Sequence, residues 1–281
     1  MTAATAIRQG IEQLSGDGIP EPRLTAEVLL AHALGRERAW LYGHPEQELT
    51  GIEQLHYGRY LYERLRRKPT QYITGRQEFY GREFRVTPAV LIPRPETELM
   101  VETALRLAPR ARRVLDVGTG SGCLAVTLAR ELPGAVVWAS EISDQALAVA
   151  KQNAARLGAA VRFFRGDLLG AVRGGALDLV ASNPPYIAEE EAGDLAAEVR
   201  HYEPAVALLG GPLGVDFYRR LLRDAPSALR PGGWLMLELG HDTRPRIEPW
   251  IGSGWSDCIV EPDLAGIDRV LALRRCGTMP A

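Results

Sequence analysis

Four consecutive residues could together hold a planar amino group for reaction: Asn183, Pro184, Pro185 and Tyr186. They follow the apolar run 177–182, which is typical of a buried parallel strand. Two consecutive prolines fix φ and remove two backbone donors, so the Asn183 carboxamide and the Pro184 carbonyl are held as acceptors. The Tyr186 ring follows and could cover the bound group. The sequence therefore predicts that these four residues form a catalytic site for an NH₂ group at the end of a strand.

A glycine-rich turn earlier in the chain could approach a cofactor closely. It follows the strand-like run 114–117 and precedes a helix-like segment that contains Leu124 and Leu128. Glycine permits positive φ and lets a ligand approach the backbone, while a helix N-terminus adds unpaired N–H groups. The turn lacks the G-x-G-x-x-G spacing of dinucleotide-binding proteins and the Lys-Ser/Thr of a P-loop. Its candidate cofactor-binding residues are Asp116, Gly118, Thr119, Gly120, Ser121 and Gly122.

Two acidic residues follow the next two expected strands and could bind parts of a nucleotide. Glu141 ends the run 135–140, where a carboxylate is placed to accept hydrogen bonds from ribose hydroxyls. Asp167 follows the run 161–164 and could accept from an adenine amino group, with Leu168 against the ring. A lone glycine turn or a lone acid is usually only a tight turn or solvated surface. All of them in order, at the spacing of βαβ units, favour a cofactor site.

The same residues resemble the class I methyltransferases that use S-adenosylmethionine. The resemblance implies that the turn 118–122 packs against the methionine part, that Glu141 holds the ribose and that Asp167 faces adenine. Many relatives carry Asp where Glu141 stands. The cofactor would be S-adenosyl-L-methionine and its product S-adenosyl-L-homocysteine, and Asn183 would also contact the cofactor.

Expected strands and helices alternate from Arg112 onward, which predicts an α/β domain with a parallel sheet. The methyltransferase resemblance implies a seven-stranded, mostly parallel, Rossmann-like sheet whose last two strands are antiparallel. We expect a helical substrate-recognition domain over residues 1–70, a β-hairpin and proline linker over 71–93, and the methyltransferase domain over 94–281.

Helix signals fill the N-terminal segment. Pro22 suits the first position of a helix and Gly35 its C-terminal end. A later helix is expected from about Thr50 to Arg67. Its apolar or aromatic positions are mostly spaced as on a helix: Ile52, Leu55, Tyr62 and Leu65.

The segment 91–98 carries two prolines that force an extended approach to a following helix. This segment would form a hinge between domains or one wall of the cofactor pocket. Phe79 and Thr97 are lesser candidates for that wall.

The motif at residues 183–186 by itself fits two groups of methyltransferases. One acts on exocyclic amines of adenine or guanine, and the other on the side-chain amide of glutamine. The segments 72–75, 78–81, 92–98 and 198–219 are similar to the bacterial release factor glutamine methyltransferases of the PrmC/HemK type. This resemblance implies N5-methylation of the glutamine in the Gly-Gly-Gln loop of class-1 peptide chain release factors, in translation termination. Glutamine methylation of a ribosomal protein and N-methylation of a nucleobase are the alternatives.

The composition of the chain limits the classes of partner and location that we expect. With 46% apolar and 24% charged residues, the chain has the composition of a globular protein. A net charge of −2 does not favour a nucleic-acid partner. The N-terminal residues lack the sustained apolar core expected of a signal peptide, and no apolar stretch approaches the length of a membrane span. Its three separated cysteines lack metal-ligand spacing, so we expect no metal and a cytoplasmic location.

Overall fold

The computed structural model describes residues 1–172 and 174–277. The chain forms two compact units. One unit contains Met1–Arg76 together with the short segment Ala196–Tyr202, and the other contains the rest of the described chain. The boundary between the units thus falls at Arg76, and one stretch from the second half of the sequence packs with the N-terminal helices.

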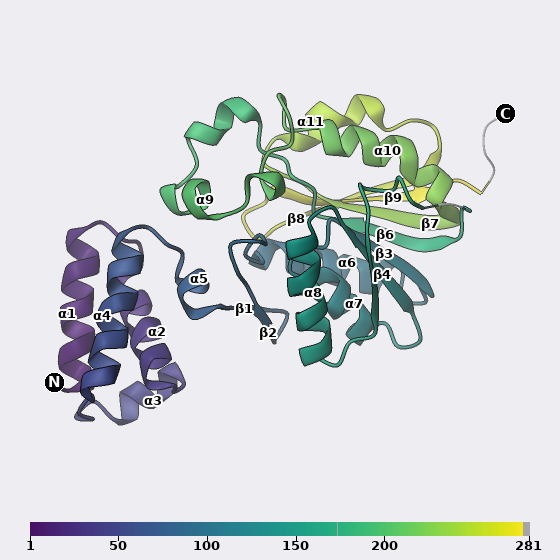
Figure 1. The fold of residues 1–281 in the computed structure, drawn as a ribbon. Helices are drawn as coiled ribbons and strands as arrows, with labels where there is room; N and C mark the ends of the chain where they lie inside the picture. Colours follow the sequence, from purple (N-terminus) through teal and green to yellow (C-terminus); the bar gives the residue numbers. More distant parts are fainter. Residues whose placement is uncertain (173, 278–281) are drawn as a thin grey trace. The chain divides into compact units, whose positions relative to one another are not determined.

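The first unit is helical (Figure 1). Its core joins apolar residues such as Leu14, Leu29 and Leu61, as α1 packs against α2 and α2 against α4. Pro22 begins a helix and Gly35 ends it at φ 61°, as the sequence predicts. The helices are α1 (Ala3–Gly16), α2 (Pro22–Leu34), α3 (Arg38–Gly43), α4 (Gly51–Leu65), α5 (Thr70–Thr74) and α9 (Ala197–Tyr202).

Helix α4 buries a different face from the one that its apolar residues suggested. Thr50 caps its N-terminus, and the Glu53 carboxylate accepts from the Thr50 backbone N–H in return. Tyr57, Leu61 and Arg64 face the core, one or two turns apart. The opposite face carries three of the four expected apolar positions, and these are 59–71% exposed: Ile52, Leu55 and Tyr62. The helical period identifies two faces of a helix, but it does not decide which one is buried.

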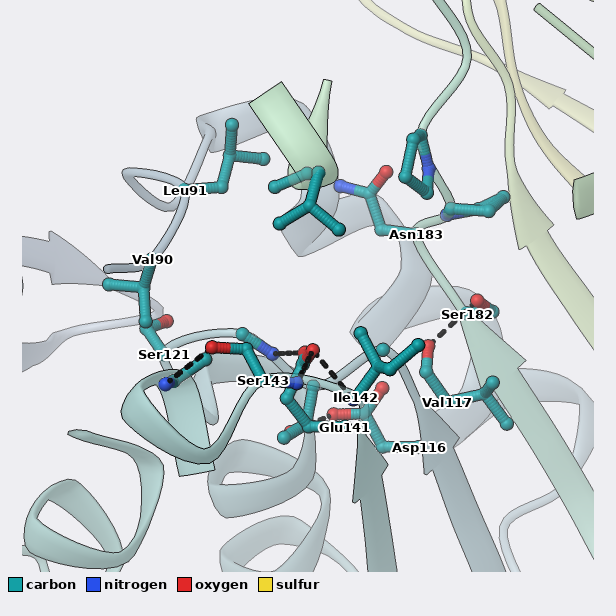
Figure 2. Close-up of a pocket in the computed structure, with 18 of the residues that line it drawn as sticks. Val90, Leu91, Asp116, Val117, Ser121, Glu141, Ile142, Ser143, Ser182 and Asn183 are labelled. Atoms are coloured by element: carbon teal, nitrogen blue, oxygen red, sulfur yellow. Dashed lines mark hydrogen bonds between the residues drawn. The ribbon is translucent and has the colours of Figure 1, made fainter. Parts of the chain in front are cut away.

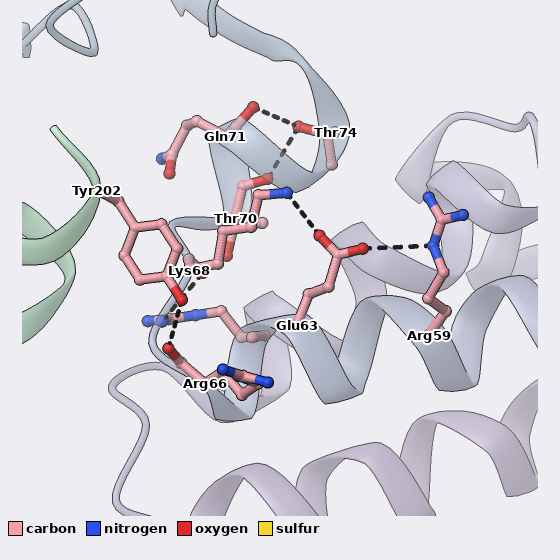
Figure 3. Close-up of polar contacts among 9 residues, drawn as sticks. Arg59, Glu63, Arg66, Lys68, Thr70, Gln71, Thr74 and Tyr202 are labelled. Atoms are coloured by element: carbon pink, nitrogen blue, oxygen red, sulfur yellow. Dashed lines mark hydrogen bonds and ion pairs between the residues drawn. The ribbon is translucent and has the colours of Figure 1, made fainter. Parts of the chain in front are cut away.

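Polar contacts hold α9 within the helical unit. The Arg64 guanidinium, whose side chain is 4% exposed, pairs with Glu198 at 2.7 Å. The Tyr202 hydroxyl donates to the Arg66 carbonyl at 2.7 Å (Figure 3). On the neighbouring turn, the Glu63 carboxylate pairs with Lys68 at 2.6 Å. A buried, paired arginine tolerates little displacement, so the Arg64–Glu198 contact ties α9 to α4.

The second unit is built on one twisted sheet of seven strands in the order β5-β4-β3-β6-β7-β9-β8. The first five strands in this order pair in parallel, and β9 pairs antiparallel with both β7 and β8. This confirms the predicted mostly parallel sheet with an antiparallel last pair. The strands are β3 (Arg113–Val117), β4 (Val136–Glu141), β5 (Val161–Arg165), β6 (Leu177–Ser182), β7 (Leu229–Glu238), β8 (Trp255–Pro262) and β9 (Asp268–Arg275). A separate hairpin joins β1 (Arg76–Phe79) to β2 (Arg82–Arg85).

Helices cover both faces of this sheet and create two apolar cores (Figure 1). Successive residues of β3 point to opposite faces: Val114 joins one core and Leu115 the other. The first core lies under α6 (Glu98–Leu107), α7 (Cys123–Glu131) and α8 (Asp144–Arg156). The second lies under α10 (Asp216–Ala228) and α11 (Thr243–Ile247). Because helices cover both faces of the sheet, a ligand is expected to bind at the edge where the parallel strands end. In the described chain no helix is long and apolar enough to cross a bilayer.

Candidate active site

The glycine turn and the Asn-Pro-Pro-Tyr segment leave the sheet from adjacent strands. Val117 at the end of β3 pairs with Ser182 at the end of β6. The Ser182 hydroxyl donates to the Val117 carbonyl at 2.8 Å and locks this register. Asn183 therefore follows β6 directly beside the point where Gly118 follows β3. Two motifs that are far apart in the sequence meet at one edge of the sheet.

Positive φ angles shape the glycine turn. Gly118, Gly120 and Gly122 have φ of 72°, 54° and 83°, which residues with a Cβ rarely adopt. Gly122 has a second constraint, because a Cβ there would lie 3.1 Å from the Ala150 Cβ on α8. The turn is thus a backbone surface that α8 supports from behind.

Asp116 orders this turn from below. Its buried carboxylate accepts from the Thr119 hydroxyl at 2.6 Å and from the Ala125 backbone N–H at 3.1 Å. Burial raises the pKa of Asp116 to about 7, although both hydrogen bonds oppose that shift. The carboxylate connects the strand, the turn and the first turn of α7. This contact gives Asp116 a clear role in shaping the site, in addition to its place on the cavity wall.

Glu141 holds the other side of the turn (Figure 2). Its Oε2 accepts from the Gly120 backbone N–H at 3.0 Å. Its Oε1 accepts from the N–H groups of Ile142 and Ser143 at 2.8 and 3.0 Å. Three backbone donors therefore fix the carboxylate at the tip of β4. Oε2 accepts only one of these donors, so it still has a lone pair with which it could bind a hydroxyl.

Asp167 has a partner that the sequence did not reveal. Its Oδ2 accepts from the Arg220 guanidinium of α10 at 2.7 Å, at a partly exposed position. Arg220 and Leu168 both line the cavity, and Leu168 has a positive φ of 48°. No sequence signal joins Asp167 to an arginine so far along the chain. An ion pair at this rim leaves Asp167 with one carboxylate oxygen for a ligand.

These elements enclose a cavity of about 280 Å³ with a mostly apolar lining (Figure 2). Of the residues predicted to bind the cofactor, all except Gly122 line this cavity. Gly122 packs against α8 instead. Asn183, Pro184, Pro185 and Thr97 line it as well. Several further lining residues were not among the predicted site residues: Ala89, Val90, Ile142, Ser143, Val206, Ala207 and Phe217.

The proline segment forms part of the cavity wall, and Glu203 anchors it there. Leu91, Pro93 and Arg94 line the cavity. The buried Glu203 carboxylate pairs with Arg94 at 2.5 Å and accepts from the Ile92 backbone N–H at 3.1 Å. A buried charge requires such partners, so this carboxylate fixes the segment in place.

Two aromatic residues of the predicted site are not among the residues that line the cavity. Phe79 does not line the cavity: it is buried in the first core and packs edge-on against Phe84. We correct its assignment to the pocket wall, because the β1–β2 hairpin turns it toward α6 and α7. Tyr186 packs beside the second core, against Gly240, and is not among the residues that line the cavity. Burial raises the pKa of its hydroxyl.

The fold and the glycine turn define a methyltransferase of the Rossmann-like class. Residues 95–213 match the methyltransferase small domain, and residues 5–75 match the PrmC N-terminal domain. A solved methyltransferase from Pyrococcus furiosus shares this fold, with a TM-score of 0.53 and 22% identity over 70% of this chain and 91% of that one.

Two relatives at higher identity define the family more narrowly. The chain is 47% identical to the release factor glutamine methyltransferase of Koribacter versatilis, over 98% of this chain and 99% of the relative. It is 46% identical to the protein of the same name from Geobacter sulfurreducens, over 93% of this chain and 92% of the relative. The chain belongs to the family of release factor glutamine methyltransferases.

Proposed function

We propose that this enzyme transfers a methyl group from S-adenosylmethionine to N5 of the glutamine in the Gly-Gly-Gln loop of class-1 peptide chain release factors. One observation carries the proposal. The pairing of Val117 with Ser182 brings the glycine turn and Asn183 to the same cavity. A site that binds a methyl donor is thereby next to a site that binds a planar NH₂ group.

The cavity suits S-adenosylmethionine in its chemistry. The turn 118–122 presents bare backbone for the methionine part, Glu141 presents a fixed carboxylate oxygen, Oε2, for the ribose, and Asp167 with Leu168 presents an acceptor and an apolar surface for adenine. When bound, the cofactor supplies a methyl group activated by its sulfonium. Asp116 supports the turn from the strand beneath it.

The chain's own contribution is alignment of the target amide. Asn183 Oδ1 and the Pro184 carbonyl accept the two N–H bonds of the glutamine amide and set the direction of its nitrogen. Pro185 keeps the loop in shape, because its ring restricts φ. Such positioning can lower a barrier by roughly 7–11 kcal/mol. No side chain is needed as a base, since an N-alkylated amide cation is very acidic and releases its proton to water. A role for the Tyr186 ring in covering the amide stays a prediction.

The protein substrate is larger than the cavity, so other surfaces must bind it. We assign that task to the N-terminal helical domain, whose compact unit extends to Arg76, six residues beyond the predicted boundary at residue 70, and includes Ala196–Tyr202. The exposed apolar side chains of α4 offer a surface for it. Release factors act on ribosomes in the cytoplasm, which is where we place this enzyme, with no direct nucleic-acid binding.

Incubation with a purified class-1 release factor and methyl-labelled cofactor tests the proposal. Mass spectrometry of the digested product should locate one methyl group on the glutamine of the Gly-Gly-Gln loop. A release factor with that glutamine replaced by glutamate is the matched control and should acquire no label. Label on a ribosomal protein or on RNA, with none on the release factor, would overturn the proposal in favour of an alternative substrate.

A further inference from the structure

A second glycine-rich segment, residues 208–214, lies against residues 183–187, which carry the proposed catalytic groups. We call the first of these the clamp segment and the second the catalytic loop. The Ile187 backbone N–H donates to the Leu208 carbonyl at 3.0 Å, and the Ile187 carbonyl accepts from the Gly210 N–H at 2.8 Å. These two hydrogen bonds form a short parallel bridge, so the two segments are joined through backbone one residue after the Asn-Pro-Pro-Tyr motif.

Two glycines of the clamp segment allow this close approach. A Cβ on Gly210 would lie 2.6 Å from the Pro185 carbonyl oxygen, and a Cβ on Gly214 would lie 2.3 Å from the Tyr186 carbonyl oxygen. Both oxygens belong to the backbone of the catalytic loop, so neither can turn aside as the end of a flexible side chain could. A larger residue at either position would therefore displace the loop or the clamp segment.

A third glycine lies against the aromatic ring of the loop. A Cβ on Gly240 would lie 2.5 Å from Cδ2 of Tyr186. The residue before it, Leu239, is fixed twice by Arg269: its N–H donates to the Arg269 carbonyl at 2.7 Å, and its carbonyl accepts from the Arg269 guanidinium at 3.1 Å. The catalytic loop thus packs against backbone from two different segments.

We propose that Gly210 and Gly214 are positioning residues, which hold the Asn183 carboxamide and the Pro184 carbonyl in the geometry that methyl transfer requires. This inference rests on the proposed function, because it concerns how these two acceptors meet the target amide. Neither glycine is among the residues that line the cavity, so neither touches the reacting atoms. Both act through the backbone of the catalytic loop.

The need for a clamp follows from the stiffness of the loop. The two prolines restrict their own backbone and that of the residue before each of them, so the loop moves as a body and does not bend. A stiff loop keeps its place only when both of its ends are held. The Ser182 hydroxyl holds the first end by donating to the Val117 carbonyl at 2.8 Å. The clamp segment holds the second end at Ile187, so a shift there is passed on to both acceptors.

Alanine at each clamp glycine tests the inference. An ordinary contact with a Cβ needs at least about 3.4 Å, so Gly210→Ala and Gly214→Ala must move the loop or the clamp segment by about 1 Å. The kcat for release factor should fall about 100-fold, which is the cost of such a misplacement. The KM for release factor should stay about the same, because other surfaces bind most of the protein substrate. The Kd for S-adenosylhomocysteine should change by less than about twofold, since the turn 118–122 and Glu141 form that site.

Two glycines outside the site provide matched controls. Gly233→Ala adds a Cβ 2.9 Å from the carbonyl oxygen of Leu177, which begins β6, so it reproduces the backbone contact of Gly210→Ala away from the loop. Gly266 has a φ of 79°, close to the 70° of Gly214, and a Cβ there would meet no atom of the described chain within 4 Å. Both control variants should lower the melting temperature and leave kcat unchanged at temperatures where the protein is folded.

The kinetic constants decide between positioning and a general loss of structure. A similar fall in kcat in all four variants would overturn the positioning role. So would a Gly210→Ala enzyme with kcat within twofold of wild type, or clamp variants whose Kd for S-adenosylhomocysteine rises as much as kcat falls.

Hydrogen exchange separates this inference from the proposed function, because it needs no substrate. The Ile187 N–H closes the bridge, so it should exchange slowly in wild type and about tenfold faster or more in Gly210→Ala and Gly214→Ala. The variants Gly233→Ala and Gly266→Ala should leave it protected. Unchanged exchange at Ile187 in both clamp variants would overturn the clamp. A wild-type enzyme that fails to methylate release factor, but shows the expected exchange pattern, would overturn the proposed function alone.

Discussion

Replacement of Glu141 by Gln tests how the cofactor site is prepared before any ligand binds. The wild-type carboxylate accepts three backbone N–H groups, two at Oε1 and one at Oε2. A glutamine side chain has only one oxygen. With that oxygen facing Ile142 and Ser143, its NH₂ group would meet the Gly120 N–H, and two donors would oppose each other.

The expected loss follows from this count. One charge-assisted hydrogen bond is removed, which is worth about 1.5–3 kcal/mol. At about 1.4 kcal/mol per tenfold, the Kd for cofactor should rise roughly 10- to 150-fold. The loss should appear in binding, because the loosened turn 118–122 must be ordered again around the methionine part.

Calorimetric titration with S-adenosylhomocysteine measures the effect. Asp144→Asn is the matched control, because it removes a carboxylate only three residues away that is exposed and paired with Arg165 at 2.9 Å. An exposed pair contributes about 0–1 kcal/mol to stability, so the control should bind cofactor like wild type. A Glu141→Gln enzyme that binds within twofold of wild type would refute the reasoning that this carboxylate organises the turn.

Four further predictions concern the rest of the molecule. Asn183→Ala should retain cofactor affinity while turnover of release factor falls by orders of magnitude; near-normal turnover would rule out its assigned role. Gly122→Ala should lower both the melting temperature and cofactor affinity, because it adds a Cβ 3.1 Å from Ala150 at a φ of 83°. Glu198→Ala should leave Arg64 buried and unpaired and destabilise the helical unit by about 3–5 kcal/mol, visible as faster hydrogen exchange in α4; unchanged exchange would contradict the pair's role. The raised pKa of Asp116 means that its contribution to stability is full below about pH 4 and is lost as pH rises to about 7, so Asp116→Asn should flatten the pH dependence of the melting temperature over that range.

Local signals in the sequence were sufficient for the parallel sheet and its two motifs. Gly118, Gly120 and Gly122 adopt positive φ because glycine has no Cβ. A cluster of glycines after an apolar run therefore indicates a turn of this kind from the sequence alone. The Asn-Pro-Pro-Tyr segment was equally readable, since proline restricts its own backbone and that of its neighbour. Strand ends in parallel sheets lie at one edge, so the meeting of these motifs could be anticipated.

Contacts between distant side chains could not be read in this way. Arg220 on α10 reaches Asp167, in the loop after β5, only through the way α10 packs on the sheet. Thr97, the residue before α6, reaches Asn183 only because α6 begins near the loop that follows β6. Each of these contacts depends on the order of strands and on the path of a helix, neither of which a single residue type encodes.

The sequence by itself indicated the main strands and helices and predicted which residues carry the chemistry, because backbone preference and apolar period act over a few neighbouring residues. The tertiary structure alone decided that Phe79 packs in a core, that α4 exposes Ile52 and Leu55, and that α9 joins the N-terminal helices. Burial is decided by the total surface that all elements remove from water together, and two faces of similar apolar content can be ranked only when their partners are known.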